Sequence, residues 1–329
     1  MDKMLEMALN MPEMLLGAYG LGLNGAFKKG QKIKNIVISG MGGSAIAGDI
    51  VAALFWDKVC LPIFVERGYH LPAFVDASSL VFILSYSGET EETLSIFKEA
   101  RACRAKIVCV TSGGQVKNIA KKQKLPYFLV PAGLQPRAAL AYLLVPILKV
   151  FSDLGLYPSL KKDLDEALNI LAAQKNENTA GQLAKTICRK TPVILASNGL
   201  TKAVAIRLKA QFSENSKITS MFSVFPELCH NEIVSLAALE RSQHNFCLLM
   251  LRDPGEPKRL NKRIEITKSL IGSQVGGIHE IWAKGESRLA KILSLTFFAD
   301  LLSVYLALEL GQDPSQIEVI TRLKKELAR

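Results

Sequence analysis

The fold of the first half of the chain is decided by Lys34-Asn35-Ile36-Val37-Ile38-Ser39-Gly40-Met41-Gly42-Gly43-Ser44. Residues 34–39 form a short apolar run, which is typical of a strand buried on both faces of a parallel sheet. A glycine-rich loop follows at residues 40–43, and residues 44–55 read as a helix. A strand, a glycine-rich loop and a helix in this order predict the beginning of a doubly wound α/β domain.

The alternation of strands and helices continues beyond this stretch. Strands that alternate with helical segments indicate a parallel sheet with helices on both faces. Four more strands are predicted at residues 61–65, 80–85, 106–110 and 127–130, with a helix at residues 91–101.

The second half of the chain repeats this beginning. The sequence predicts a strand at residues 192–196, a loop at 197–199, a helix at 200–212 and another strand at 246–251. The offset of about 160 residues between the two beginnings indicates two similar domains and not one large sheet. We therefore expect two three-layer α/β/α sandwich domains with parallel sheets, at residues 1–155 and 156–329, the second ending in helices.

The composition narrows the class of protein. The chain has 329 residues, of which 49% are hydrophobic and 22% charged, which excludes a disordered chain, a collagen and a simple coiled coil. Lysine and arginine number 41 against 30 acidic residues, so the net charge is +11. The basic residues are spread along the chain, and no RNA-binding signature occurs. We therefore expect a small anionic partner and no nucleic acid.

Cysteine spacing and hydropathy indicate the cellular compartment in which the protein is expected. None of the six cysteines lies in a CxxC motif or at zinc-finger spacing from a histidine, so free thiols in a reducing cytoplasm are expected. The first residues lack the basic segment and apolar core of a signal peptide, and an amphipathic helix is expected there. Residues 292–310 are apolar enough to span a membrane. Asp300 in their middle favours a helix buried between the domains, and no membrane partner is expected.

Two loops have the composition of a phosphate-binding site. The loop at residues 40–44, Gly-Met-Gly-Gly-Ser, leads into a helix whose amides and dipole favour an anion. The loop at residues 85–90, Ser-Tyr-Ser-Gly-Glu-Thr, supplies three hydroxyls before another helix. Since ligands bind beyond the carboxyl ends of parallel strands, both loops are expected beside one phosphomonoester. The alternative is that these hydroxyls only cap the following helices.

The first loop also matches a dinucleotide-binding fingerprint. Gly40, Gly42 and Ala45 occupy the G-x-G-x-x-A positions, and Glu66 ends the second predicted strand, where an acid that binds a ribose is expected. An NAD(P)-dependent dehydrogenase is therefore an alternative. The hydroxyl-rich second loop favours a monophosphate over a dinucleotide.

Three other residues have positions that invite a functional explanation. Arg137 follows Pro136 in the first turn of a predicted helix, where a cation opposes the helix dipole unless it faces an anion. A solvent-exposed arginine is the alternative. Glu214 lies near the C-terminal end of a predicted helix, and an ion pair with Lys217 would explain it. His230 is compatible with a structural role, and no metal-ligand spacing such as HExxH occurs.

Four motifs occur along the chain in this order: Gly40-Met41-Gly42-Gly43-Ser44, Ser85-Tyr86-Ser87-Gly88-Glu89-Thr90-Glu91-Glu92-Thr93, Gln135-Pro136-Arg137-Ala138-Ala139-Leu140 and Pro226-Glu227-Leu228-Cys229-His230-Asn231-Glu232. With them the chain resembles the bifunctional phosphoglucose/phosphomannose isomerase family, which is built from two sugar-isomerase (SIS) domains. The first two motifs are shared by many SIS proteins, and the last two are more specific to this family. The resemblance extends over nearly the whole chain, to Gly285-Glu286-Ser287 and Leu323-Lys324.

The resemblance implies a role for each candidate residue. It also implies a homodimer in which His230 is supplied across the interface, and a reaction that needs neither cofactor nor metal. Catalysis would involve Glu214 as the base, His230 and Lys324 in ring opening, and Arg137 beside the enediolate. The sugar 6-phosphate would be bound by Gly43, Ser44, Ser85, Ser87 and Thr90.

The implied reaction interconverts glucose 6-phosphate and fructose 6-phosphate, and also mannose 6-phosphate, through a cis-enediol. One carboxylate can carry a proton between C1 and C2, and a cation can offset charge on the enediolate. Two positions depart from the family pattern: Cys229, where relatives often have asparagine, and Ser315, in an Asp-Pro-Ser-Gln segment where relatives often read Asp-Pro-Thr-Pro. The alternative from another class is a non-catalytic SIS module, which needs only the serine loops.

Overall fold

The computed structural model describes residues 2–27, 32–238 and 245–327, which fall into two compact units, each with its own sheet. The domain boundary near residue 155 stays a prediction, and each unit is described by itself. The N-terminal unit comprises Asn10–Ala172 and Gly285–Ala290, and the C-terminal unit comprises Met1–Leu9, Ala173–Lys284 and Lys291–Arg329.

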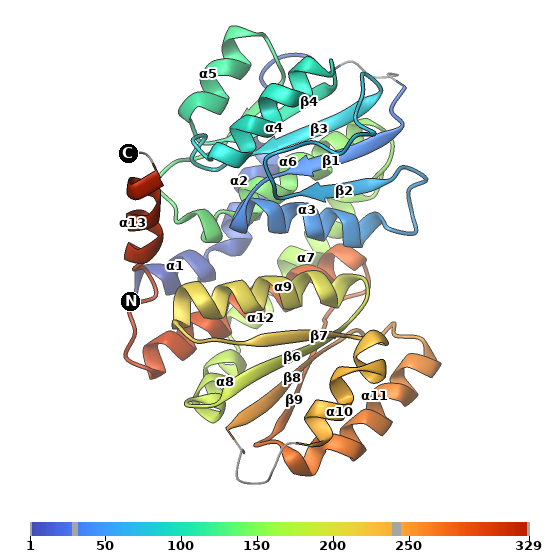
Figure 1. Cartoon of the computed structure of the whole chain (residues 1–329), viewed down its shortest axis with the longest axis vertical. Helices are drawn as coiled ribbons and strands as arrows, with labels where there is room; N and C mark the ends of the chain where they lie inside the picture. Colours follow the sequence, from blue (N-terminus) through green and yellow to red (C-terminus); the bar gives the residue numbers. More distant parts are fainter. Residues whose placement is uncertain (1, 28–31, 239–244, 328–329) are drawn as a thin grey trace. The chain divides into compact units, whose positions relative to one another are not determined.

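The sheet of the N-terminal unit has the strand order β2-β1-β3-β4-β5, and all of its pairs are parallel (Figure 1). This order confirms the doubly wound sheet expected from the sequence. The central strand β3 is buried along its whole length, as its unbroken apolar run predicts. The strands are β1 (Asn35–Ser39), β2 (Ile63–Glu66), β3 (Ser79–Leu84), β4 (Lys106–Thr111) and β5 (Tyr127–Leu129).

Helices cover both faces of this sheet. They are α2 (Met11–Gly20), α3 (Gly42–Phe55), α4 (Glu91–Ala102), α5 (Gly114–Lys122), α6 (Leu140–Asp153) and the first part of α7 (Leu160–Lys175). Val81 packs with Phe97 of α4 on one face. Its neighbour Phe82 points to the other face, as the period of two in a strand requires, and its ring lies 6.3 Å from that of Phe151 in α6.

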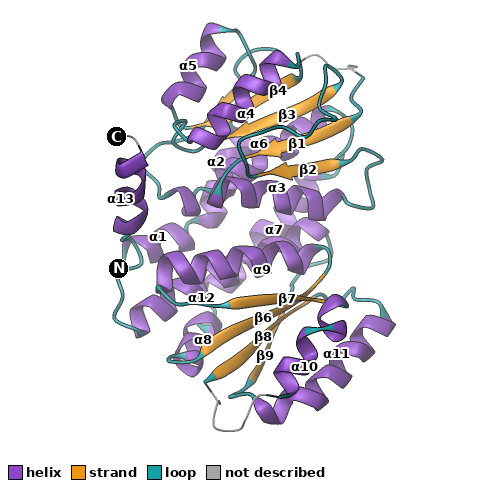
Figure 2. Cartoon of the chain, in the orientation of Figure 1, coloured by secondary structure: helices purple, strands orange, loops and turns teal. Residues whose placement is uncertain are grey.

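The sheet of the C-terminal unit has four parallel strands in the order β7-β6-β8-β9 (Figure 2). The two inner strands were predicted, and the two edge strands were not. The strands are β6 (Thr191–Ser197), β7 (Met221–Phe225), β8 (Phe246–Arg252) and β9 (Ile278–Trp282). The helices are α1 (Lys3–Leu9), α8 (Thr179–Ile187), α9 (Leu200–Gln211), α10 (Glu232–Ala237), α11 (Lys258–Ile271), α12 (Arg288–Glu309, whose first turn belongs to the N-terminal unit) and α13 (Glu318–Leu327).

Helix α12 is long and apolar enough to cross a membrane, but 78% of its most apolar 18-residue window is buried. Asp300 in this helix is only 3% exposed, and both of its carboxylate oxygens accept hydrogen bonds from Arg207 of α9, at 2.8 and 2.6 Å. Charged groups are found in protein cores when they are paired, as this carboxylate is with the guanidinium of Arg207. These contacts make α12 a core helix of the C-terminal unit.

The cysteines are free, as the sequence predicts. Cys109 and Cys247 are buried in β4 and β8, where they serve as small apolar side chains. Burial raises the pKa of the Cys247 thiol to about 11, so this side chain stays a neutral thiol at physiological pH.

Candidate functional site

The two predicted phosphate loops lie beside each other at the carboxyl edge of the N-terminal sheet. The reason is that β1 pairs directly with β3, with Ser39 opposite Ile83. A β-carbon on Gly40 would lie 3.0 Å from the carbonyl oxygen of Leu84. This close approach brings the loop that leads into α3 against the end of β3, where the serine-rich loop begins.

Hydrogen bonds inside the serine-rich loop hold its hydroxyls in place. The Oγ of Ser85 lies 3.0 Å from the Oγ1 of Thr90 and accepts a hydrogen bond from the amide of Gly88, also at 3.0 Å. The exposed Ser87 accepts from the amide of Glu89 at 3.2 Å. The three predicted hydroxyls thus belong to one ordered turn, with Ser85 buried at its base.

Helix capping does not account for these hydroxyls. Thr90 is the N-cap residue of α4, but its side chain makes no capping bond and contacts Ser85 instead. Ser44 lies inside the first turn of α3, not at its N-cap, which is Met41. Hydroxyls are therefore held at the N-termini of two helices, where the helix dipole favours an anion.

The segment that contains Arg137 packs against the first loop. Pro136 begins a short 3-10 helix, Pro136–Ala138, and α6 begins at Leu140. A β-carbon on Gly43 would lie 3.0 Å from the α-carbon of Arg137 and 3.0 Å from the carbonyl oxygen of Pro136. Glycine at position 43 therefore permits backbone contact between the two segments. Arg137 is only 2% exposed, so the alternative of a solvated surface arginine is wrong.

Tyr86 connects the serine-rich loop to the segment that leads to Arg137. Its hydroxyl donates to the carbonyl oxygen of Pro131 at 2.8 Å and accepts from the amide of Leu134 at 2.9 Å. Burial raises the pKa of Tyr86 and outweighs the opposing effect of the hydrogen bond from Leu134. The phenol is therefore neutral and available as a donor at physiological pH.

A second set of contacts fixes the other side of the serine-rich loop. Both carboxylate oxygens of Glu89 accept from Gln115, one from its amide at 2.9 Å and the other from its side chain at 2.7 Å. Gly88 has φ +73°, and a β-carbon there would lie 2.0 Å from the carbonyl oxygen of Gly113. Only glycine fits this turn. The loop is thus held between the start of α5 and the segment before Arg137.

Glu66 has a local partner. Its carboxylate accepts a hydrogen bond from the amide of Gly68 at 2.5 Å, which closes a tight turn after β2. This bond explains an acid at the end of the second strand without a ribose, so it removes one support for the dinucleotide alternative.

In the C-terminal unit, Glu214 lies in one π-helical turn, Phe212–Ser216, that continues α9. The sequence placed this residue near the end of a helix, and the structure shows that the widened turn follows Gln211 directly. Single π-helical turns are frequently found at functional sites. Glu214 is half-buried and borders a cavity of about 380 Å³.

Buried polar contacts anchor this turn to α12. The side-chain amide of Asn215 donates to the Oγ of Ser303 at 2.9 Å, and the hydroxyl of Ser216 donates to the carbonyl oxygen of Ser303 at 2.6 Å. The amine of Lys217 donates to the carbonyl oxygens of Glu214 and Asp313, at 2.6 and 3.0 Å. Lys217 therefore links the Glu214 turn to the segment that precedes α13.

Lys324 is exposed on α13, whose first turn lines the same cavity as Glu214. Ile320, four residues before Lys324, is one of the lining residues. Residues four apart share one face of a helix, so Lys324 lies on the α13 face that borders the Glu214 cavity. Ser315 lies in the preceding turn, where its amide donates to Asp313.

His230 is exposed at the end of the 3-10 helix Glu227–His230 and does not line the Glu214 cavity. The neighbouring Cys229 is half-buried, with its Sγ 3.6 Å from the Oγ1 of Thr267 in α11. The structure therefore brings together the residues predicted to bind the phosphate and Arg137. Within the C-terminal unit, the α13 face that carries Lys324 borders the Glu214 cavity, and His230 does not line that cavity.

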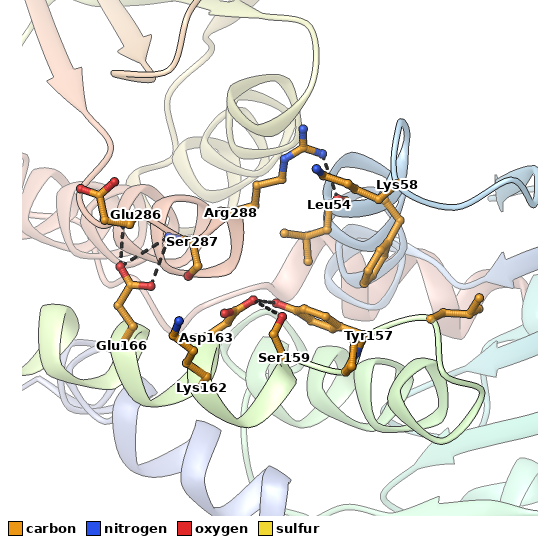
Figure 3. A pocket seen from close by; sticks show the side chains of 13 residues that line it. Leu54, Lys58, Tyr157, Ser159, Lys162, Asp163, Glu166, Glu286, Ser287 and Arg288 are labelled. Atoms are coloured by element: carbon orange, nitrogen blue, oxygen red, sulfur yellow. Dashed lines mark hydrogen bonds between the residues drawn. The ribbon is translucent and has the colours of Figure 1, made fainter.

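A further cavity of about 930 Å³ lies at the other end of α3 (Figure 3). The acids here have protein partners: Asp163 accepts from the hydroxyl of Tyr157, and Glu166 from the amide of Ser287. The loops at residues 40–44 and 85–90 do not line this cavity. We therefore do not assign the sugar phosphate to this cavity. Its lining includes Leu54, Lys58, Ser159, Lys162, Glu286 and Arg288.

Sequence reasoning missed the residues that hold the loops in place. Tyr86 stood inside the quoted serine motif, yet its partners lie 45 and 48 residues further along the chain. Lys217 was considered only as an ion-pair partner of Glu214, and the hydrogen bonds of its amine to the main-chain carbonyl oxygens of Glu214 and Asp313 were not anticipated. The only signal for Tyr86 was an aromatic residue between two serines in a polar loop.

Comparison with known proteins finds a SIS domain in each half of the chain. Residues 31–124 match the family model of the SIS domain, and residues 176–327 match that of the bacterial phospho-glucose isomerase C-terminal SIS domain. A bifunctional phosphoglucose/phosphomannose isomerase of Caldicellulosiruptor bescii is 39% identical over 99% of both chains. A protein of the same name from Aquifex aeolicus is 38% identical over 90% of this chain and 91% of its own.

Solved structures support the fold. The C-terminal domain of glucosamine-fructose-6-phosphate aminotransferase from Francisella tularensis superposes with a TM-score of 0.76. The match covers 95% of this chain and 98% of that chain, at 19% identity. At this identity the likeness concerns the fold alone, and it confirms that both halves are SIS-type α/β domains.

Proposed function

Because the chain belongs to the bifunctional phosphoglucose/phosphomannose isomerase family, we propose that it interconverts glucose 6-phosphate and fructose 6-phosphate, and mannose 6-phosphate with the same ketose. One observation in the N-terminal unit supports this proposal most directly. The hydroxyls of Ser85 and Thr90, the first turn of α3 and the segment of Arg137 converge at the carboxyl edge of one sheet.

The 6-phosphate of the sugar would be bound by Gly43, Ser44, Ser85, Ser87 and Thr90. Amides at a helix N-terminus and short hydroxyls suit a phosphomonoester, because both donate hydrogen bonds to its oxygens and the helix dipole adds to the attraction. Arg137 would lie beside the reacting carbons and stabilise the negative charge that develops on the enediolate. Binding the distant phosphate would also hold the reacting carbons in position.

Glu214 would act as the base that takes a proton from C2 of the aldose and returns it to C1. The same carboxylate serves both steps, so the reaction needs no redox cofactor and no metal. The π-helical turn, anchored through Asn215 and Lys217, gives this carboxylate a fixed backbone. Proton transfer by a positioned carboxylate typically contributes a factor of about 10²–10⁴.

Ring opening would be assisted by His230 and Lys324, which can exchange protons with the ring oxygen and the anomeric hydroxyl. We propose that the protein is a homodimer and that His230 of one subunit serves the site of its partner. The exposed position of His230, outside the Glu214 cavity, is compatible with a role across an interface. Six free cysteines fit a reducing cytoplasm as the location.

A direct test is to measure isomerisation of glucose 6-phosphate, mannose 6-phosphate and fructose 6-phosphate side by side with the purified chain, in assays coupled to product formation. Turnover of all three would support the proposal, and turnover of glucose 6-phosphate without mannose 6-phosphate would restrict it to one epimer. Binding of hexose 6-phosphates without turnover would instead support a non-catalytic SIS module. Tight binding of NAD(P) would support the dehydrogenase alternative.

A further inference from the structure

We propose that Tyr86 is a positioning residue for the isomerase reaction, because its hydroxyl couples the loop that binds the phosphate to the segment that carries Arg137. This role rests on the proposed function. It assigns to Tyr86 the alignment of two groups that act on opposite ends of one substrate, the 6-phosphate and the enediolate.

The contacts of Tyr86 place it between the two groups. Its backbone belongs to the serine-rich loop, between Ser85 and Ser87, and its carbonyl oxygen accepts from both the amide and the hydroxyl of Ser112, at 2.9 and 2.6 Å. Its side chain bonds a different segment further along the chain, at Pro131 and Leu134. A single residue therefore bonds the segment before α5 with its main chain and the segment before Arg137 with its phenol.

The hydroxyl makes both contacts that its chemistry allows. It donates to one backbone carbonyl and accepts from one backbone amide, and the side chain is only 6% exposed. Removing the oxygen would leave both backbone groups without this partner in a site that water hardly reaches. The segment 131–135, which otherwise runs as an irregular loop, would then be freer to shift.

A shift of this segment would act on Arg137 more than on the phosphate. Leu134 precedes Arg137 by three residues, and Gly43 leaves no room between the first loop and Pro136. Ser85 and Thr90 keep their mutual contact without the phenol, and Gly88 and Glu89 keep the hydrogen bonds that they accept from the first turn of α5. Small displacements of a group that stabilises a transition state lower kcat without changing ground-state binding.

The test compares Tyr86→Phe with Tyr157→Phe in the full-length protein. Tyr157 is a matched control: it is 8% exposed, lies in the same unit and donates one hydroxyl hydrogen bond, to Asp163 at 2.9 Å, at the far end of α3. For Tyr86→Phe we expect kcat with glucose 6-phosphate to fall about tenfold while KM changes by less than about twofold. For Tyr157→Phe we expect both constants to stay at their wild-type values.

Two inhibitors separate positioning from a general loss of structure. Inorganic phosphate reports on the serine loops, and its inhibition constant should be the same in Tyr86→Phe and wild type. A hydroxamate analogue of the enediolate reports on Arg137, and its inhibition constant should rise about tenfold in step with the loss of kcat. Thermal unfolding of both variants monitors folding. Should Tyr86→Phe fail to fold, 4-aminophenylalanine at position 86 retains a donor and is expected to keep most of kcat.

The outcomes distinguish this role from the proposed function. An inactive wild-type chain would overturn both together. An active wild type would leave the function intact, and the role of Tyr86 alone would be overturned by equal kinetic effects of the two tyrosine substitutions. It would also be overturned by a rise in the phosphate inhibition constant that accounts for the whole effect of Tyr86→Phe.

Discussion

Gly43 and Arg137 are in backbone contact: a β-carbon on the glycine would fall 3.0 Å from the α-carbon of the arginine. Neither partner can yield easily, because Arg137 is buried and its segment is bonded to Tyr86 through Leu134. The contact fixes the distance between the N-terminus of α3 and the arginine. In the proposed reaction, this distance sets how a phosphate and an enediolate of one sugar fit together.

Gly43→Ala is therefore expected to weaken substrate binding. The added methyl group must push the first turn of α3, whose amides would bind the phosphate, away from the arginine segment, and overpacking of this kind typically costs about 1–3 kcal/mol. We expect KM for glucose 6-phosphate to rise about tenfold, which corresponds to about 1.4 kcal/mol. Steady-state kinetics measures it. Gly20→Ala is the control, because no atom lies within 4 Å of a β-carbon there, and equal KM values for the two variants would contradict the prediction.

Glu214→Gln is expected to lower kcat by a factor of about 10²–10⁴, because an amide cannot take the proton from carbon. The substitution keeps the size of the side chain, so binding of inorganic phosphate and the unfolding transition should not change. The matched control is Glu318→Gln, which removes a carboxylate from the first turn of α13 in the same cavity. Ordinary turnover by Glu214→Gln would exclude this residue as the base.

Mixing two inactive variants tests the proposed dimer. If Glu214 of one subunit works with His230 of its partner, Glu214→Gln and His230→Asn should each lack activity as pure proteins. After unfolding and refolding together, random association makes half of the dimers mixed, and each mixed dimer has one intact site. About a quarter of the wild-type activity should return. No recovery, with mixed dimers present by mass spectrometry, would show that both residues act within one chain.

In the C-terminal unit, the sequence predicts the inner strands but not the edge strands, for a physical reason. β3 and β8 are covered on both faces, so their residues form unbroken apolar runs that can be recognised directly. β7 and β9 are the edges of the C-terminal sheet. β9 reads Ile-His-Glu-Ile-Trp, in which polar residues interrupt the run, and pairing with β8 is what makes it a strand.

The candidate site also has a part that the sequence predicts and a part that it does not. Its loops are local motifs, so the sequence alone predicted that the regions of Gly43 and Ser85 lie at neighbouring strand ends. The 3-10 helix at Arg137 and the π-helical turn at Glu214 were expected only as parts of ordinary helices. Their form depends on contacts with distant residues, such as Asn215 with Ser303, 88 residues apart. No spacing rule in the sequence reports such contacts.

The ion pair of Arg207 and Asp300 is expected to be costly to break. Both side chains are almost fully buried, so Asp300→Asn leaves a guanidinium in the core with its counter-charge removed. The free energy of unfolding should fall by about 3–5 kcal/mol, whereas Arg207→Met combined with Asp300→Leu should lose much less. Urea unfolding measures both. Glu177→Gln breaks the exposed pair with Lys284 and serves as a surface control, with an expected loss below about 1 kcal/mol.

Because of Glu166, the free energy of unfolding of the N-terminal unit is expected to fall as the pH becomes acidic. Its partial burial alone would raise its pKa, but hydrogen bonds from the amide of Glu286 (2.6 Å) and from the side chain and amide (3.1 Å) of Ser287 together outweigh this effect, so the pKa of Glu166 lies below its usual range. These bonds attach the segment 285–290 to α7 (Figure 3). A carboxylate favoured by folding adds stability above the unfolded pKa of glutamate, about 4.3, and this stability disappears as pH falls through the lower folded pKa.

Glu166→Gln should therefore be less stable than wild type at pH 7, because a neutral amide oxygen accepts the same bonds more weakly. The difference should shrink as the pH is lowered from 5 towards 3, since the wild-type carboxylate becomes protonated in that range. Urea unfolding at several pH values measures this trend. Asp165→Asn on the same helix is the control, because Asp165 pairs with the exposed Lys161 at the surface and should have little effect. A stability difference between Glu166→Gln and wild type that stays constant with pH would show that these hydrogen bonds do not favour the charged form of Glu166.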